Sequence, residues 1–255
     1  MKNVAVYRCL FNDYDYFLED LYVTSNVDYY LFTDNQNIKS HNYKKILVET
    51  KEKNPSLDNR SLKLNIPDEL LNYDLTIYLD TNICIVDDIS SLIESFLSSK
   101  AEIGLFKHPY HNSINDDIDM CIESNKSNAE IIKKELDYYE SLGLVPRDNL
   151  SDNSIIFRKK QNENMLNAMK YWTHLVKSFS GRDQISLPMV RSKFNLNEYF
   201  FNFSPRTKDN NYFVVFPHKP KYKKTSLLEF FKSNIRFIYR LLLRYYIFTQ
   251  NKVKK

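Results

Sequence analysis

The segment TIYLDTNICIVDD, residues 76–88, ends an apolar run with a carboxylate and an amide, Asp80 and Asn82. Alternate residues of an extended segment face the same way. Two oxygen ligands on one side of a strand end suit Mg²⁺ or Mn²⁺, which prefer carboxylate, carbonyl and water oxygens. Asp and Asn also favour turns, so an ordinary strand followed by a turn is the alternative. The rest of the sequence must distinguish a metal site from a turn.

Two basic residues precede this segment in NRSLKLN. Arg60 and Lys63 are three residues apart, so on a helix both project from one face. Arg can hold a phosphate with two hydrogen bonds, and Lys supplies a point charge. We therefore expect this pair to contact a phosphate, with a solvated basic face as the alternative.

A third segment, GRDQISL, begins a predicted helix with Arg182, Asp183 and Gln184. Asp183 could orient an acceptor hydroxyl, and Gln184 could lie near a sugar. The alternative is an acidic residue that the helix dipole favours at this position.

A fourth segment, VVFPHKPKYKK, places His218 after a predicted strand and before a basic loop. A neutral imidazole would favour Mn²⁺ over Mg²⁺ as the bound ion. Lys219 and Lys221 could reach a phosphate. The alternative is a histidine on the surface.

The elements that must position these residues follow from the spacing of apolar side chains. Strands are predicted at 3–11, 27–34, 43–50, 75–86 with a polar interruption, 101–109, 154–159 and 211–216; helices at 57–71 with a break at Pro67, 87–99 with an Asp cap, 128–143, 162–180 and 182–194 with an interruption at Pro188. This alternation predicts an α/β fold with a mainly parallel sheet flanked by helices. Ligands bind at the carboxyl ends of such strands, where Asp34, Asp80 and His108 are expected.

The composition excludes several classes of site. Glycine occurs only three times in 255 residues, so no glycine-rich phosphate loop is present. The three cysteines are far apart, which excludes a zinc knuckle and a disulfide framework and fits a reducing cytoplasm. The N-terminal apolar run is too short for a signal peptide, and no uninterrupted apolar run reaches the ~18 residues of a membrane-spanning helix.

The C-terminal segment differs from the rest in charge. Residues 219–255 carry eleven Lys or Arg and one acidic residue, while the whole chain has a net charge of +4. Basic side chains recur every fourth residue from Lys232 to Arg244, and the other faces are apolar. We predict a basic amphipathic helix at 223–255, appended to a domain at 1–222, whose residues 223–248 lie on an anionic membrane surface. Packing on the chain's own core or on a second copy in a homodimer is the alternative; nucleic acid is not expected, because the segment is too apolar.

The order of these motifs resembles GT-A glycosyltransferases, above all the glycogenin and lipopolysaccharide-galactosyltransferase type. In that type an Arg- and Lys-bearing helix precedes a YLD-x-D strand end, as NRSLKLN precedes YLDTN here. SDNSIIFR is similar to their Asn-Ser-Gly strand, and RDQISL is similar to their Asp-Gln element. His218 and Lys219 are similar to their C-terminal metal histidine and phosphate lysine.

A second resemblance rests on YRCLFNDYDYFLED, YYLFTDN, YLDTNICI, HPYHNSINDDIDMCIE and GRDQISLPMV in this order. Together they resemble a glycosyltransferase-like family of bacterial polysaccharide clusters and plant Golgi proteins, over roughly residues 4 to 220. The resemblance implies a GT-A fold (Rossmann-like), a nucleotide-sugar donor and a divalent metal ion, Mn²⁺ or Mg²⁺.

The resemblance also implies roles for individual residues. The metal would be held by Asp80, Asn82 and His218; the donor by Asp34, Arg60, Lys63, Asn153, Lys219 and Lys221; the acceptor by His108, His111 and Arg182; and Asp152, Asp183 and Gln184 would line the catalytic centre. Asn82 departs from the usual second Asp, which removes one negative charge and weakens the expected metal affinity. The Gly of Asn-Ser-Gly is missing, as are the Gly and Trp usual near the metal histidine.

We therefore expect a metal-dependent glycosyltransferase of the hexosyltransferase type, and the Asp-Gln resemblance favours retention of the anomeric configuration. It would move a sugar to a lipid-linked or polysaccharide acceptor in bacterial surface glycan synthesis, such as lipopolysaccharide or capsule, as a peripheral protein on the inner face of the cytoplasmic membrane. The alternatives are a metal-dependent nucleotide or phosphate-ester hydrolase and a non-catalytic module that binds a membrane surface.

Overall fold

The computed structural model describes residues 2–50, 55–124, 127–147, 149–160, 162–207, 209–216, 218 and 219. The chain forms two compact units, Met1–Val215 and Phe216–Lys255, and only Phe216, His218 and Lys219 of the second are described. The predicted tail helix at 223–255 and the boundary at residue 222 lie outside the described residues. The fold below is that of the first unit.

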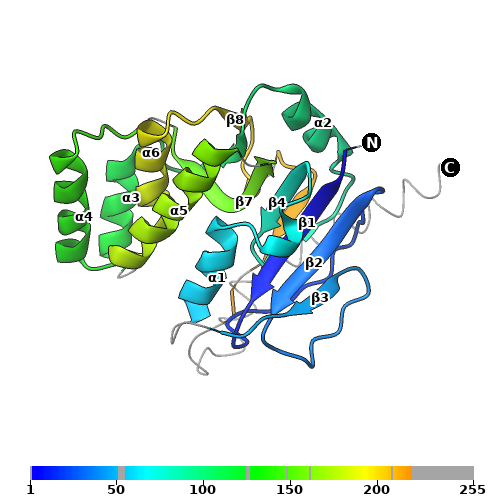
Figure 1. Ribbon diagram of the computed structural model, residues 1–255. Coiled ribbons are helices and arrows are strands. Elements are labelled where there is room, and N and C mark those ends of the chain that lie inside the picture. Colours follow the sequence, from blue (N-terminus) through cyan, green and yellow to red (C-terminus); the bar gives the residue numbers. More distant parts are fainter. Residues whose placement is uncertain are drawn as a thin grey trace. The chain divides into compact units, whose positions relative to one another are not determined.

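A seven-stranded sheet forms the centre of this unit, in the order β3-β2-β1-β4-β7-β6-β8 (Figure 1). Neighbours β3, β2, β1 and β4 are parallel, β7 is antiparallel to both β4 and β6, and β8 is parallel to β6. A second sheet pairs β5 with β9. The strands are β1 Val4–Leu10, β2 Val27–Thr33, β3 Lys44–Leu47, β4 Leu75–Leu79, β5 Ile83–Ile85, β6 Ile103–Lys107, β7 Ser151–Lys159, β8 Glu198–Phe201 and β9 Phe213–Val215. The predicted α/β fold with a mainly parallel sheet is confirmed.

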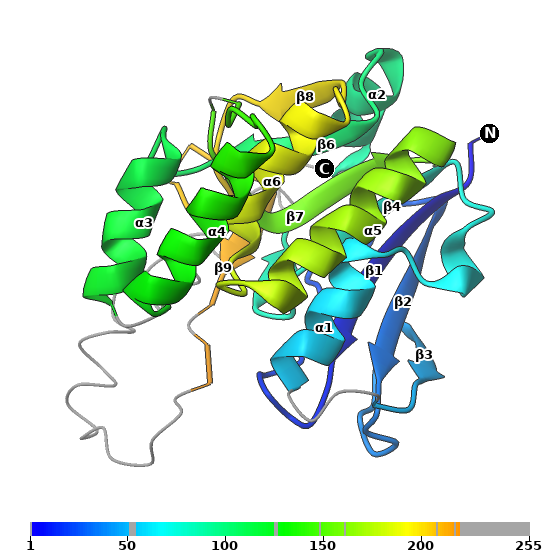
Figure 2. The ribbon, with the colours of Figure 1, turned by 60° about the vertical axis from the view of Figure 1, so that its left-hand side comes forward.

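Helices cover the sheet because each buries an apolar stripe. They are α1 Pro55–Leu64, the 3-10 helix η1 Asp68–Leu70, α2 Ser90–Ser98, α3 Ile114–Glu123, α4 Ala129–Ser141, α5 Glu163–Ser178 and α6 Asp183–Lys193. Figure 2 shows α1 and α5 side by side across the sheet. The start of α5 is fixed by Asn162, whose side chain accepts a hydrogen bond from the Met165 N–H at 2.8 Å.

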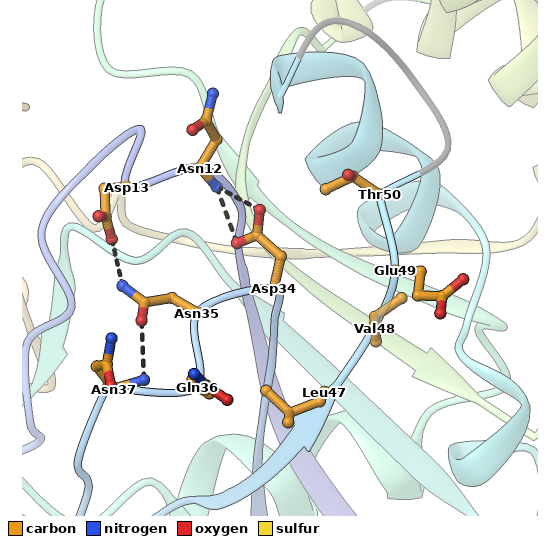
Figure 3. A pocket seen from close by; sticks show the side chains of 10 residues that line it. All are labelled: Asn12, Asp13, Asp34, Asn35, Gln36, Asn37, Leu47, Val48, Glu49 and Thr50. Atoms are coloured by element: carbon orange, nitrogen blue, oxygen red, sulfur yellow. Dashed lines mark hydrogen bonds between the residues drawn. The ribbon is translucent and has the colours of Figure 1, made fainter.

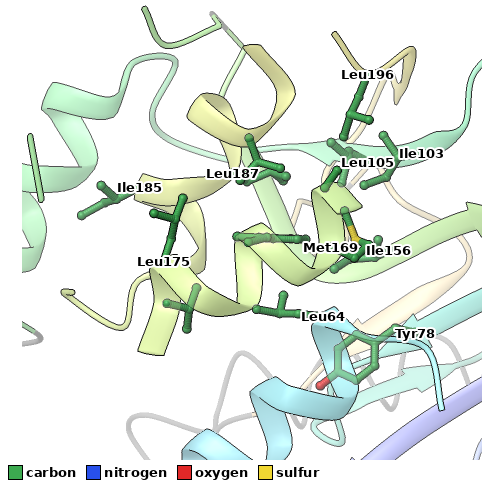
Figure 4. Packing of buried hydrophobic residues seen from close by; sticks show 14 of the residues in the cluster. Leu64, Tyr78, Ile103, Leu105, Ile156, Met169, Leu175, Ile185, Leu187 and Leu196 are labelled. Atoms are coloured by element: carbon green, nitrogen blue, oxygen red, sulfur yellow. The ribbon is translucent and has the colours of Figure 1, made fainter. Parts of the chain in front are cut away.

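Two apolar clusters lie on the two faces of the sheet. Leu64 of α1, Met169 of α5 and Leu187 of α6 pack against Tyr78 of β4 and Ile156 of β7 (Figure 4). On the other face, α2 and the small sheet pack against the alternate strand residues. Strands β1 and β4 are buried on both faces and consist mostly of apolar residues, as in parallel sheets that are covered on both sides.

Three details differ from the sequence prediction. Helix α6 continues through Pro188, because burial of most of its residues outweighs the backbone hydrogen bond that proline removes. The N-cap residue of α2 is Ile89, which makes no side-chain cap hydrogen bond, and the expected Asp lies one residue earlier: Asp88 Oδ1 accepts from the Ser90 N–H at 3.0 Å. Strand β7 begins at Ser151 rather than at Ser154 and runs antiparallel to its neighbours.

The sequence prediction also missed two elements, α3 and β8. Helix α3 had recognisable signals: Ser113 and Asp116 form a capping box, and Ile114, Ile118 and Cys121 are buried at helical spacing. Strand β8 is a short aromatic segment, EYFF, which is typical of strands.

Candidate active site

The site begins at the end of β4, where Asp80 closes a turn. The Asp80 N–H donates to the Ser154 carbonyl at 2.8 Å, and the Asp80 carbonyl accepts from the Ile83 N–H at 3.0 Å. The Tyr78 hydroxyl donates to Asp80 Oδ1 at 2.8 Å. Asp80 Oδ2 receives no hydrogen bond from any residue that the structure describes, and the side chain is 26% exposed. One carboxylate oxygen is therefore fixed while the other remains available to a ligand.

Lys63 connects Asp80 to the start of α6. Its Nζ lies 2.8 Å from Asp183 Oδ2 and 3.5 Å from Asp80 Oδ1, and all but 8% of its side chain is buried. Burial opposes the charge on Lys63, but Asp183 and Asp80 outweigh it and raise its pKa. Lys63 is therefore a cation neutralised by two acids that lie more than a hundred residues apart in the sequence.

Asp183 is charged in this arrangement. Burial favours the protonated carboxyl, but Lys63, Arg60 and Arg182 overcome that effect and lower the pKa of Asp183 to about 2. Arg60 lies on α1 with Lys63, and its Nη1 donates to Ser56 Oγ at 2.6 Å. The structure thus brings Arg60, Lys63, Asp80 and Asp183 into one electrostatic cluster.

Arg182 and Gln184 flank Asp183 and contact each other. Arg182 Nη2 donates to Gln184 Oε1 at 2.6 Å, and the Arg182 N–H donates to Ser180 Oγ at 3.2 Å. The amide oxygen of Gln184 is therefore held by the side chain two residues before it.

The reversed direction of β7 brings Asp152 to the same edge of the sheet. Because β7 is antiparallel to β4 and β6, its first residues lie beside the last residues of those strands: Asp152 pairs with Phe106, and the Ser154 carbonyl accepts from Asp80 N–H. Asp152 is 2% exposed. Its Oδ1 accepts from the Ser154 N–H at 3.0 Å.

Asn153 was predicted to bind the donor next to Asp152 of the catalytic centre, but consecutive strand residues face opposite sides of a sheet. Asn153 is 1% exposed, and its Oδ1 accepts from Ser151 Oγ at 2.6 Å. Within the described residues its Nδ2 has no hydrogen-bond partner. Asp152 and Asn153 therefore do not line a single surface, although both are buried at this edge.

Arg206 is a residue that the sequence interpretation missed. Its Nε lies 2.9 Å from Asp152 Oδ2. Burial opposes its charge, but Asp152 and then Asp80 raise the pKa of its guanidinium, which places it near the end of β4. No local motif indicated this contact, because 54 residues separate the two partners.

His108 and His111 lie after β6 and form part of the same edge. The His111 N–H donates to His108 Nδ1 at 3.0 Å, so Nε2 carries the hydrogen of the neutral ring. Burial lowers the pKa of His108, although Asp117 and Asp152 oppose this effect. Asp117 of α3 is fully buried, and its Oδ1 lies 4.0 Å from His111 Nδ1. The sequence interpretation did not single out Asp117, because α3 was not predicted.

Asp34 lies at the end of β2, beside an open hollow of about 930 Å³ (Figure 3). Both oxygens of Asp34 accept from the Asn12 N–H, at 2.9 and 3.0 Å. Asn12 and Asp13 have φ values of 50° and 46°, so Asp34 holds a left-handed backbone turn. Asn35 Nδ2 donates to Asp13 Oδ1 at 2.8 Å on the same rim.

A buried ion pair supports the backbone on the other side of the Asp80 turn. Arg8 of β1 pairs with Asp20, and both side chains are fully buried. Arg8 Nη1 also donates to the Thr81 carbonyl at 3.4 Å, and Asp20 Oδ1 accepts from the Ile85 N–H at 2.7 Å. These contacts fix the segment between β4 and β5, and the sequence interpretation did not identify them.

Three predicted residues belong to the second unit. His218 and Lys219 are exposed there, and Lys221 lies outside the described residues. Asn82 belongs to the first unit and is 1% exposed. In the described part of the chain, no three His, Cys, Asp or Glu side chains come together as a ligand set for a metal ion.

The fold and the charged cluster define an α/β domain with a ligand site at the carboxyl edge of its sheet. A family model described as TOD1/MUCI70, glycosyltransferase-like domain, matches residues 70–218. The chain belongs to this family, which confirms the resemblance to glycosyltransferase-like proteins. The matched segment includes Asp80, Asp152, Asp183 and Arg206 but begins after Lys63.

Among solved structures, the chain is similar to the apo structure of the WbbM bifunctional glycosyltransferase, with 12% identity and a TM-score of 0.48 over 78% of this chain. The chain spans 39% of the length of that protein. No curated protein matches the sequence.

Proposed function

We propose that this chain transfers a sugar, of the hexose type, from a nucleotide-sugar donor to a polysaccharide or lipid-linked acceptor, with Mn²⁺ or Mg²⁺ as cofactor. The observation that carries this proposal is the bridge from Asp80 through Lys63 to Asp183 at the carboxyl edge of the sheet in a glycosyltransferase-like domain. A charged site with fixed partners suits a reaction in which a diphosphate leaves.

The oxygen donors at the end of β4 fit a hard divalent ion. Asp80 is partly exposed and its Oδ2 has no hydrogen-bond partner among the described residues, and Asn82 carries an amide oxygen two residues later. His218, the third ligand that the resemblance implies, belongs to the second unit. The ion, when bound, would stabilise the negative charge that develops on the departing nucleoside diphosphate.

The chain's own residues would position the two substrates. Arg60 is available to a phosphate of the donor. Lys63 bridges Asp80 and Asp183 and favours the charged form of Asp183, and Asp183 with Gln184 would face the sugar. His108, with hydrogen on Nε2, would donate a hydrogen bond to the acceptor. Retention of the anomeric configuration is the outcome that the Asp-Gln resemblance favours.

The test replaces Asp80 with Ala and measures turnover of a nucleotide-sugar panel with Mn²⁺. Asp74→Ala is the matched control, because Asp74 precedes β4 at the opposite edge and accepts the Asn3 N–H at 3.0 Å. We expect Asp80→Ala to lose Mn²⁺-dependent turnover and retain its circular dichroism spectrum, while Asp74→Ala stays active. Unchanged turnover in Asp80→Ala would refute the metal assignment, and release of free sugar without an acceptor would indicate a hydrolase instead.

We further propose that residues 223–248 bind an anionic membrane surface and keep the enzyme at the inner face of the cytoplasmic membrane. The support is the basic, amphipathic sequence alone. In the part of the chain that the structure describes, no helix combines the length and the apolar character needed to cross a membrane. A chain truncated after Tyr222 should lose co-sedimentation with anionic vesicles, and undiminished binding would contradict the proposal.

A further inference from the structure

We infer that Arg206, positioned by the buried carboxylate of Asp152, binds a phosphate oxyanion in this site. The identification of that phosphate with part of a substrate rests on the proposed function. The binding of a phosphate by Arg206 does not rest on the proposed function, because it can be measured without turnover.

The first support is that, among the described residues, only the Nε of the Arg206 guanidinium has a side-chain hydrogen-bond partner. Its Nε donates to Asp152 Oδ2 at 2.9 Å, while Nη1 and Nη2 have no hydrogen-bond partner among the described residues. The Arg206 side chain is 35% exposed, against 2% for that of Asp152. A guanidinium anchored through Nε presents its two remaining nitrogens as a fork, which matches the oxygens of a phosphate.

The second support is a comparison with Arg147, an arginine of similar exposure in the same unit. Arg147 is 30% exposed, and its Nη1 donates to Glu198 Oε2 at 2.9 Å and to the Leu196 carbonyl at 2.8 Å. Its Nη2 donates to Asn195 Oδ1. The fork of Arg147 is therefore occupied by the protein, whereas no described residue occupies the fork of Arg206.

The third support is the state of Asp152. Oδ1 accepts from the Ser154 N–H at 3.0 Å and Oδ2 accepts from Arg206 Nε, so both oxygens have protein partners. A buried carboxylate whose two oxygens both accept hydrogen bonds is fixed in place, so it holds the Arg206 guanidinium in one orientation. The geometry makes Asp152 a positioning residue, in place of the catalytic role that the resemblance implied.

The last support is the position of Arg206 close to the end of β4. Asp80 raises the pKa of Arg206, so the open fork lies in the electrostatic field of the strand end that carries the proposed metal ligand. Arg60 acts on Asp183 from the side of α1. Arg206 reaches the same cluster from the segment that follows β8, which gives the site a second cation for a bound phosphate.

The experiment measures binding of inorganic pyrophosphate to the full chain by calorimetry, in buffer with a chelator so that no divalent ion contributes. We expect Arg206→Gln to weaken binding by about tenfold or more, the usual effect of losing a charge-assisted hydrogen bond. Arg206→Lys keeps the charge but loses the fork, so a smaller loss of several-fold is expected. Arg147→Gln is the matched control and should bind as the wild type does.

Asp152→Asn gives the sharpest outcome. Removal of a negative charge near an anion site strengthens anion binding by electrostatics alone, whereas loss of the anchor weakens it. We expect weaker binding, by several-fold. Binding equal to or tighter than that of the wild type in Asp152→Asn, or unchanged binding in Arg206→Gln, would overturn the inference. If Arg206→Gln does not fold, as judged by thermal unfolding, Arg206→Lys decides the question in the same way.

Competition identifies the source of the phosphate. If a nucleoside diphosphate displaces pyrophosphate, Arg206 binds the donor; if both bind together, Arg206 binds a phosphate on the acceptor. Weaker pyrophosphate binding in the variants without any nucleotide-sugar turnover in the wild type would sustain the role of Arg206 and refute the proposed function.

Discussion

Replacement of Lys63 by Met should destabilise the protein by about 3 kcal/mol at neutral pH. The change keeps the length of the side chain but leaves Asp183 and Asp80 without the ammonium that lies 2.8 and 3.5 Å from them. Removal of one partner from a buried ion pair typically costs roughly 3–5 kcal/mol.

The pKa of Asp183 gives a second value for the stability that its pairing with Lys63 contributes. It falls from its usual value of 3.8 to about 2, largely because Lys63 outweighs burial. A shift of roughly two units corresponds to about 2–3 kcal/mol of stability at neutral pH. Because this pKa is lowered on folding, the stabilisation is present above the unfolded pKa and is lost as the pH falls through the folded value.

The pH dependence should therefore weaken in the variant. Without Lys63, only Arg60 and Arg182 oppose the effect of burial on the pKa of Asp183, so less stability is gained as the pH rises through the acid range. The stability difference between wild type and Lys63→Met should be largest near neutral pH and shrink in acid. Urea denaturation with a chelator present measures it, and the expected decrease in midpoint is about 1 M at pH 7.

Two controls define the outcome. Lys159→Met removes a lysine that donates to the Leu97 and Ser99 carbonyls and has no carboxylate partner among the described residues. We therefore expect this variant to lose about 1 kcal/mol of stability, with no dependence on the titration of an acid. The double variant Lys63→Met with Asp183→Asn should recover much of the loss. If the double variant is as unstable as Lys63→Met, the ion-pair reasoning is wrong.

Three further predictions test single residues. Asn82→Asp should raise the affinity for Mn²⁺, measured by calorimetry, because it adds a negative charge beside the proposed ligand Asp80; unchanged affinity would contradict the role of position 82. The pKa of His108 measured by NMR should lie below its usual value of 6.5, because burial favours the neutral ring. The fold then loses stability as the pH falls below 6.5 toward the folded pKa, and a pKa above 6.5 would refute this prediction. Gly104→Ala should cost about 1–3 kcal/mol in urea denaturation, because the added Cβ would lie 3.0 Å from Phe157 Cβ and from the Phe96 ring, and an unchanged midpoint would show that this contact relaxes.

The sequence by itself determined where the strands end and which polar residues follow them. Strands β2, β4 and β6 are mostly apolar toward their carboxyl ends, so these ends and the residues Asp34, Asp80 and His108 that follow them could be located from hydrophobicity. The basic pair on α1 and the start of α6 were also visible, since both lie within single helical segments.

Only the tertiary structure decided how these residues combine. The direction of β7 is a property of the sheet, and it moves Asp152 to the edge that carries Asp80. The sequence predicted that Lys63 contacts a phosphate, but packing of α1 against α5 and β1 buries it between two acids. No local sequence pattern indicates the contact of Arg206, because its partner Asp152 lies in the distant strand β7. Contacts between distant segments depend on strand order and direction, and the periodicity of a sequence encodes neither.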